Sequence, residues 1–137
     1  MIIISTYIRS GSDGGCSEFG KLSRYILNLS EGRKEKLIIL GDFNAKIGIR
    51  EINEDDRTII GRSLFHNTSN PNGMELKNFM HSLRLRNYLT FSKSKSVEWT
   101  WTNGKCQSQL DHILMTKMDF LKLPTIRAYY HTSCQKN

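Results

Sequence analysis

The segment 37–48, Leu-Ile-Ile-Leu-Gly-Asp-Phe-Asn-Ala-Lys-Ile-Gly, constrains the fold of this chain most. Its apolar run has the length of a buried strand, and Gly41 ends that run immediately before Asp42. Residues i and i+2 of an extended chain point to the same side, so Asp42 and Asn44 are predicted to share one face, with Phe43 turned toward the core. The sequence therefore predicts a buried strand that ends in a carboxylate beside a carboxamide.

A carboxylate and a carboxamide held side by side suit the hydrolysis of a phosphate ester. The acid can orient or deprotonate a water molecule, and the amide can hydrogen-bond a phosphoryl oxygen or that water. The alternative is that Asp42 and Asn44 only supply turn chemistry after the strand, as these residue types commonly do. The pair alone leaves both interpretations open.

The pattern before this strand predicts parallel pairing. Residues 2–7 read as a first strand, and a helix is predicted to begin at Ser17. The apolar positions of this helix are Phe19, Leu22, Ile26 and Leu29. A strand, a crossover helix and a second strand favour a right-handed parallel connection. Because ligand sites in such sheets gather at the carboxyl ends of the strands, Tyr7 is predicted to lie beside Asp42 in a site.

The second half of the chain is predicted to add another helix and more strands. Asn72 is the predicted N-cap of that helix, with Glu75 in the capping-box position. Residues 49–71 lack a clear period and are predicted to be mainly loop. The expected strands are 87–91, 97–101, 109–115 and 125–130. With Asn103-Gly104 turning a hairpin, the whole reads as an α/β arrangement in which one sheet carries helices on its outer face.

Three motifs carry a resemblance to a known family. Gly-Asp-Phe-Asn-Ala-x-x-Gly resembles the signature of the endonuclease/exonuclease/phosphatase superfamily. The helix start 70–73, Asn-Pro-Asn-Gly, and the segments 100–102 and 109–114 resemble its retrotransposon-type, apurinic/apyrimidinic-endonuclease-like branch, including craniofacial development protein 2-like sequences. The resemblance covers nearly the whole chain, in order and spacing. It implies that residues 1–137 form a single partial domain, part of a two-sheet α/β sandwich of the deoxyribonuclease I-like type.

The resemblance also implies roles for four residues and a metal ion. Asp42 would orient the attacking water, Asn44 and Tyr7 would hold the phosphate, and Asp111 would hydrogen-bond a histidine. This chain continues with Ile-Arg-Ser after Tyr7, where the family has a small residue and proline. For Asp111, exposure at a sheet edge is the alternative. The implied cofactor is Mg²⁺ and the implied partner is DNA.

The resemblance places two catalytic pieces of the family outside this sequence. An Asn and a metal-binding Glu would precede Met1, and a Ser-Asp-His motif would follow Asn137. We therefore expect the C-terminal half of a DNA-nicking domain, inactive by itself. The alternative is a non-catalytic remnant that binds nucleic acid weakly or associates with another chain. In the family the second face of the sheet is covered by a second sheet, so an uncovered apolar face is expected to favour association.

The roles of three further side chains are open at this level. Trp101 can stack on DNA or pack in the core, and the core is the prediction because large aromatic residues in sheets are more often buried. His112 replaces a tyrosine of the family, so a packing role is predicted. Lys46 can contact a phosphate or remain a solvated surface residue.

The composition of the chain indicates which class of partner it binds and in which compartment it is found. The formal charge of +7 favours a polyanionic partner such as nucleic acid, although many soluble proteins are this basic. No apolar run approaches the roughly 18 residues of a membrane span, and Ile2-Ile3-Ile4 is too short for a signal peptide. Three widely spaced cysteines match neither a zinc site nor a disulfide framework. We expect an intracellular protein, nuclear or cytoplasmic, that is neither secreted nor bound to a membrane.

Overall fold

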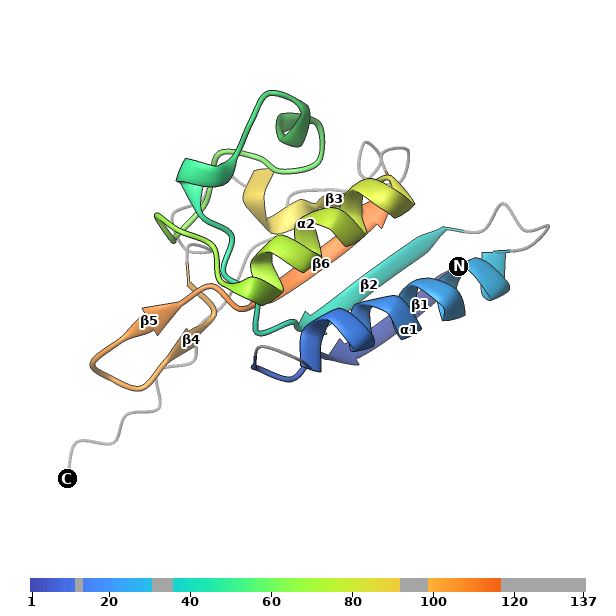
Figure 1. The fold of residues 1–137 in the computed structure, drawn as a ribbon, viewed down its shortest axis with the longest axis horizontal. Helices are drawn as coiled ribbons and strands as arrows, with labels where there is room; N and C mark the ends of the chain where they lie inside the picture. Colours follow the sequence, from blue (N-terminus) through green and yellow to red (C-terminus); the bar gives the residue numbers. More distant parts are fainter. Residues whose placement is uncertain (12–13, 31–35, 92–98, 117–137) are drawn as a thin grey trace.

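Two parallel strands joined by a helix form one side of the sheet in the computed structural model (Figure 1). β1 (Ile2–Tyr7) pairs in parallel with β2 (Leu37–Asp42), and α1 (Gly14–Ser30) connects them. This confirms the predicted strand–helix–strand unit, although α1 begins before Ser17. The structure describes residues 1–11, 14–30, 36–91 and 99–116.

Two antiparallel strands complete the main sheet. β6 (Asp111–Thr116) pairs with β2, and β3 (Leu85–Asn87) pairs with β6, which gives the order β1-β2-β6-β3. α1 and α2 (Pro71–Leu83) lie on the same face of this sheet (Figure 1). The predicted α/β layering is therefore confirmed. In the part of the chain that the structure describes, no helix is long and apolar enough to cross a membrane.

The cap of α2 differs from the prediction. Asn70, not Asn72, is the N-cap, and its side-chain oxygen accepts a hydrogen bond from the Gly73 backbone at 2.8 Å. Pro71 takes the first position of the helix, where its fixed φ fits and its missing N–H is not needed. Asn72 thus falls inside the first turn, and its side chain is buried.

Three other predicted elements are altered. The predicted strand 87–91 is instead the end of β3 followed by the 3₁₀ helix η3 (Tyr88–Phe91). The turn at Asn103-Gly104 joins a small separate ladder of β4 (Trp101–Thr102) and β5 (Gln107–Ser108), whereas the predicted hairpin strand 109–115 is β6 of the main sheet. The 49–71 loop contains the 3₁₀ helices η1 (Ile49–Glu51) and η2 (Asp55–Thr58). The predicted strand 125–130 lies outside the described residues.

The hydrophobic core lies between the two helices and one face of the sheet. Phe19 of α1 stacks on Phe43 with ring centroids 6.2 Å apart, and it meets Phe79 of α2 at 5.5 Å. Phe43 is fully buried, as predicted. On the other face of the sheet Ile3 is 57% exposed and Leu40 is 37% exposed. Among the described residues, these two apolar side chains are therefore exposed on the face of the sheet opposite the helices.

Gly41 allows β1 and β2 to meet at their carboxyl ends. Its φ of +148° disfavours any residue with a side chain, and an added Cβ would lie 1.9 Å from the Thr6 backbone oxygen. The glycine therefore brings the end of β2 against β1 and leaves Asp42 directly beside Tyr7.

Candidate active site

Three of the four predicted site residues form a row across one end of the sheet. Tyr7 is the register partner of Asp42 on the parallel strand, and Asp42 is the register partner of Asp111 on the antiparallel one. Paired residues point to the same side of a sheet, so the three side chains share the face opposite the helices. This end is where β1 and β2 finish and β6 begins (Figure 1).

Asn44 joins this row through a tight turn after β2. Its φ is +47°, a left-handed conformation that asparagine tolerates better than most residues. The Asn44 backbone nitrogen donates to Asp42 Oδ1 at 2.8 Å, and Asn44 Nδ2 donates to the Ile8 carbonyl oxygen at 2.8 Å. The turn therefore fixes one oxygen of Asp42 and ties Asn44 to the end of β1. Asp42 and Asn44 therefore form the turn after β2, and whether they also act in a site stays a prediction.

A pocket of about 420 Å³ opens beside this turn. Asp42, Asn44 and Lys46 line it on the strand side, and Trp101 lines it from the β4–β5 hairpin. The remaining lining residues are Ser10, Asn70, Ser108 and Leu110. The prediction that Trp101 is in the core is wrong, because the side chain is 44% exposed. Trp101 belongs to the two-stranded β4–β5 ladder, which is separate from the main sheet.

Tyr7 belongs to the same row but not to this pocket. The residue is 65% exposed and borders a separate hollow of about 390 Å³ that Glu18, Lys21 and Tyr25 also line. The strand register thus brings Tyr7 next to Asp42, although Tyr7 does not line the pocket around Asp42.

Asp111 is positioned by the Thr-Trp-Thr segment. Thr100 Oγ1 accepts hydrogen bonds from the backbone nitrogens of Leu110 and Asp111, both at 3.0 Å. The Phe43 backbone nitrogen donates to the Leu110 carbonyl oxygen at 3.1 Å, which joins the start of β6 to the turn after β2. Asp111 is partly buried and does not itself line the pocket around Asp42.

Two asparagines of the helix start hold the site loops, and sequence reasoning did not assign them this role. Asn72 Nδ2 donates to the carbonyl oxygens of Arg9 at 2.9 Å and Phe43 at 3.0 Å. Asn70 Nδ2 donates to the Asn44 carbonyl oxygen at 2.9 Å. The spacing of the Asn-Pro-Asn-Gly motif was visible in the sequence, but its partners are more than 25 residues away and only the fold reveals them.

His112 is a buried packing residue, as predicted. Its Nε2 donates to the Ala45 carbonyl oxygen at 2.9 Å, and its Nδ1 accepts from Asn87 Nδ2 at 2.8 Å. Complete burial lowers the pKa of His112 to about 4, against the opposing effect of the Ala45 hydrogen bond. The ring is therefore neutral near pH 7 and braces the core side of β6 behind Asp111.

His66 supports the opposite side of the pocket. Its Nε2 accepts a hydrogen bond from the Gln109 backbone nitrogen at 3.1 Å, which requires that ring nitrogen to be unprotonated. Burial lowers the pKa of His66, and the nearby positive charge of Lys46 lowers it further. His66 links the loop after β2 to the segment that leads into β6.

Comparison with known proteins assigns the family. Residues 1–133 match the family described as endonuclease-reverse transcriptase. The chain belongs to this family. No curated protein matches the chain.

A solved structure of a 3′-5′ exonuclease from Neisseria meningitidis shares the fold. The TM-score is 0.58 at 19% sequence identity, over 90% of this chain and 51% of the exonuclease. The chain thus spans about half the length of that protein. At this identity the likeness supports the nuclease-like α/β fold.

The side chains of the row supply some of the oxygen ligands that a hard divalent cation such as Mg²⁺ needs. Asp42 and Asp111 place two carboxylates opposite each other on neighbouring strands, with the amide of Asn44 close by. Mg²⁺ accepts one or two carboxylates and keeps several waters, so this oxygen-rich set suits it. Among the described residues, no third histidine, cysteine or acidic side chain joins such a group.

Proposed function

We propose that this endonuclease-reverse transcriptase family domain is the nicking endonuclease of a retrotransposon-type element, a Mg²⁺-dependent phosphodiesterase acting on DNA. The observation that carries the proposal is the pairing of Asp42 with Asp111 beside a pocket that Asn44 and Lys46 also line. Carboxylate, amide and ammonium groups converge there, as hydrolysis of a phosphodiester requires.

The residues of the row divide the chemistry between them. Asp42 has one oxygen held by the Asn44 backbone, and its second oxygen accepts the proton of the attacking water. The Asn44 amide gives one hydrogen to Ile8 and directs the other to a phosphoryl oxygen, and Lys46 neutralises the phosphate. Mg²⁺, when bound at Asp42, would stabilise the charge that develops on the phosphate.

Tyr7 and Asp111 take supporting roles in this proposal. The Tyr7 hydroxyl contacts the phosphate on the β1 side of Asp42, which its register with Asp42 supports. Asp111 is set in place by Thr100 and would orient a histidine, which is the role that the family resemblance implies. The exposed ring of Trp101 stacks on a base next to the cleaved bond.

Catalysis is proposed to need one further acidic ligand. Among residues 1–11, 14–30, 36–91 and 99–116, Glu18 pairs with Arg9, and Glu51 accepts hydrogen bonds from Ser69, so neither joins Asp42. We therefore expect the 137 residues by themselves to hold DNA and metal more readily than they cleave.

The test measures metal binding and cleavage separately. Titration with Mn²⁺, a paramagnetic substitute for Mg²⁺, is expected to broaden the backbone amide signals of Asp42, Asn44 and Asp111 in NMR spectra. Asp42→Asn should abolish this broadening, and the exposed control Asp55→Asn should retain it. Broadening centred elsewhere would refute the site.

In parallel, supercoiled plasmid is incubated with Mg²⁺. If the wild-type chain nicks the plasmid and Asp42→Asn does not, no further ligand is needed for cleavage.

A second candidate function is non-catalytic binding and association, and one observation favours it. Ile3 and Leu40 stand exposed on neighbouring strands of the uncovered sheet face. Such a surface favours contact with another chain. Sedimentation of the wild type and of Leu40→Lys distinguishes the cases: loss of association in the variant supports this function, and a wild-type monomer at all concentrations excludes it.

A further inference from the structure

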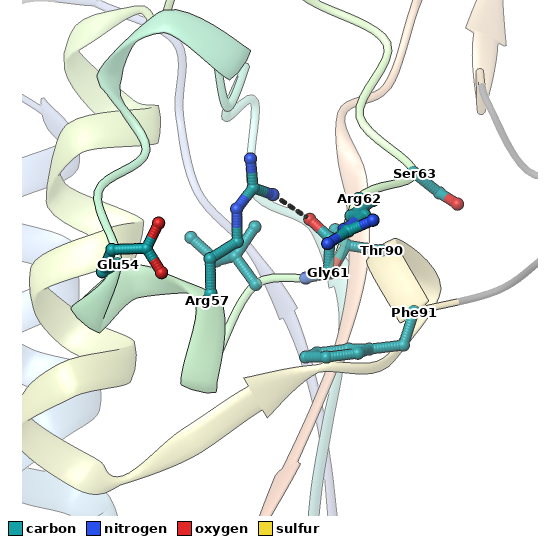
Figure 2. A pocket seen from close by; sticks show the side chains of 8 residues that line it. Glu54, Arg57, Gly61, Arg62, Ser63, Thr90 and Phe91 are labelled. Atoms are coloured by element: carbon teal, nitrogen blue, oxygen red, sulfur yellow. Dashed lines mark hydrogen bonds between the residues drawn. The ribbon is translucent and has the colours of Figure 1, made fainter.

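A second and larger cavity lies beside the end of β3. Its volume is about 710 Å³, and none of its lining residues lines the pocket around Asp42. Its walls come from η2, from the segment 60–63 and from η3, and Figure 2 shows its side chains from close by. The nuclease proposal leaves this cavity without a role.

Hydrogen bonds fix the polar wall of the cavity. Arg57 Nη1 donates to the Gly61 carbonyl oxygen at 2.9 Å, so its guanidinium is held at the cavity (Figure 2). The Gly61 backbone nitrogen donates to the buried Thr90 Oγ1 at 2.7 Å, and the Ser63 nitrogen donates to the Thr90 carbonyl oxygen at 2.9 Å. These two bonds on either side of Arg62 fix its backbone, while its side chain is exposed.

The opposite wall is an aromatic ring. Phe91 lies edge-on below Gly61 and Arg62 in Figure 2. The guanidinium carbon of Arg86 lies 5.5 Å from the centroid of this ring, a cation–π contact. Glu54 is the acidic residue of the lining, against the two cations Arg57 and Arg62. The cavity therefore combines surplus positive charge with an aromatic surface.

We propose that this cavity binds an unpaired nucleotide of a nucleic-acid strand, with Phe91 stacking on the base and the guanidinium groups of Arg57 and Arg62 holding its phosphate. Arginine matches phosphate oxygens with paired N–H donors, and stacking on an aromatic ring tolerates any base. An anion without a ring would leave Phe91 unused, and an apolar ligand would leave the arginines unused. A nucleotide contacts both walls, because its base stacks on the aromatic ring and its phosphate binds the arginines.

The position of the cavity suits a strand that also reaches Asp42. β2 and β3 are both antiparallel to β6, so they run in the same direction. η3 continues from the carboxyl end of β3, as the pocket turn continues from the carboxyl end of β2. The inference goes beyond the proposed function because it assigns a second contact at which no bond is cleaved.

Binding of a labelled single-stranded oligothymidylate, followed by fluorescence anisotropy, tests the proposal. Arg62→Gln removes a charge from an exposed position and is expected to lower affinity severalfold and to reduce the dependence on salt by about one phosphate contact. Phe91→Leu is expected to lower affinity about fivefold or more without changing the salt dependence, since stacking is not ionic. Arg24→Gln, an exposed arginine on α1, is the matched control and should bind as the wild type does.

A second measurement uses the wild-type chain and does not depend on how the variants fold. Thymidine monophosphate is expected to shift the amide signals of Gly61, Ser63 and Thr90, and inorganic phosphate should do so more weakly. Equal effects of the two ligands, or full affinity in both Arg62→Gln and Phe91→Leu, would overturn the proposal. Retention of the Mn²⁺ broadening in Asp42→Asn, with these signals still shifting, would count against the active site and leave this cavity supported.

Discussion

Asn44 has a left-handed backbone conformation and a side chain that hydrogen-bonds to Ile8, and substitutions can separate the contributions of the two to stability. Its φ of +47° is costly for alanine but not for glycine, and both substitutions remove the hydrogen bond to Ile8. We expect Asn44→Ala to lower the free energy of unfolding by about 1 kcal/mol more than Asn44→Gly does. Urea unfolding of both variants measures this difference. Equal stability would mean that the turn relaxes in solution.

His112 predicts a dependence of stability on pH. Its folded pKa of about 4 lies below the ordinary value of 6.5, so the unfolded chain takes up the proton first as the pH falls. The contribution is complete above pH 6.5 and is lost between about 6.5 and 4, on the order of 3 kcal/mol at 1.36 kcal/mol per pKa unit.

The check for His112 is urea unfolding at several pH values in that window. His112→Gln removes the titrating group, so the variant should show a smaller loss of stability than the wild type between pH 6.5 and 4. Parallel curves for the two proteins would mean that the imidazole is not buried as a neutral ring.

At the residue scale, local pattern was sufficient for some side chains and insufficient for others. The placement of Phe43 in the core and of Asp42 at a strand end follows from alternation along one strand. Trp101 was predicted to lie in the core because aromatic residues of sheets usually do, but its strand has only two residues and belongs to a ladder separate from the main sheet. Whether a side chain such as Trp101 is buried or exposed depends on which distant parts of the chain pack against it.

At the element scale, the junction of β1 and β2 depends on Gly41. We expect Gly41→Ala to destabilise the fold by about 3 kcal/mol or more, because the Cβ would meet the Thr6 backbone oxygen and the φ is unfavourable. Gly20→Ala is the matched control, since nothing lies within 4 Å of its Cβ and alanine favours a helix by about 1 kcal/mol. Thermal unfolding should therefore move in opposite directions for the two variants.

The long loop after the site turn is held to α2 by a buried carboxylate. Asp56, 2% exposed, contacts Lys77 Nζ at 3.1 Å and His81 Nε2 at 2.8 Å. It also accepts from the Asn53 backbone nitrogen at 3.0 Å. Burial alone would raise the pKa of Asp56, but these hydrogen bonds and the charge of Lys77 outweigh burial and hold the pKa below its usual range.

Asp56→Asn should therefore destabilise the fold by about 3 kcal/mol, since it leaves Lys77 without its buried counter-charge. Because the folded pKa is lowered, the Asp56 contribution is full above the ordinary Asp value of about 3.9 and disappears as the pH falls through the folded pKa. The neighbouring Asp55→Asn, exposed on η2, is the control and should leave urea unfolding at pH 7 unchanged. Equal losses of stability in the two variants would mean that the contacts of Asp56 with Lys77 and His81 do not stabilise the fold.

Element types were predictable where one period persisted, as in β1, α1 and β2. The elements that differ from the prediction are those whose ends are determined by single hydrogen bonds. β3 ends at Asn87 because the chain turns into η3, where Thr90 Oγ1 donates back to the Asn87 carbonyl oxygen at 2.8 Å. The N-cap is Asn70 instead of Asn72 because Asn70 Oδ1 accepts from the Gly73 nitrogen, whereas Asn72 Nδ2 donates to a carbonyl oxygen of the distant loop after β2. Neither contact leaves a periodic trace in the sequence.

For the whole molecule, net charge and the position of each charge make different predictions about DNA. The charge of +7 predicts that the logarithm of the binding constant falls linearly with the logarithm of salt concentration, whichever residues contact phosphate. The proposed site predicts more, because Lys46 lines the pocket at the carboxyl end of β2, whereas Lys36 precedes the opposite end of the same strand. Lys46→Gln and Lys36→Gln remove the same charge from the two ends of the sheet.

Duplex DNA binding measured across a salt series therefore separates a general basic surface from a site. If DNA lies across the carboxyl ends of β1 and β2, Lys46→Gln should reduce the salt dependence by about one phosphate contact, while Lys36→Gln leaves it close to wild type. If both variants lose the same amount, net charge alone attracts the DNA. The row of Tyr7, Asp42 and Asp111 would then share the fold of a nuclease without engaging its substrate at this end of the sheet.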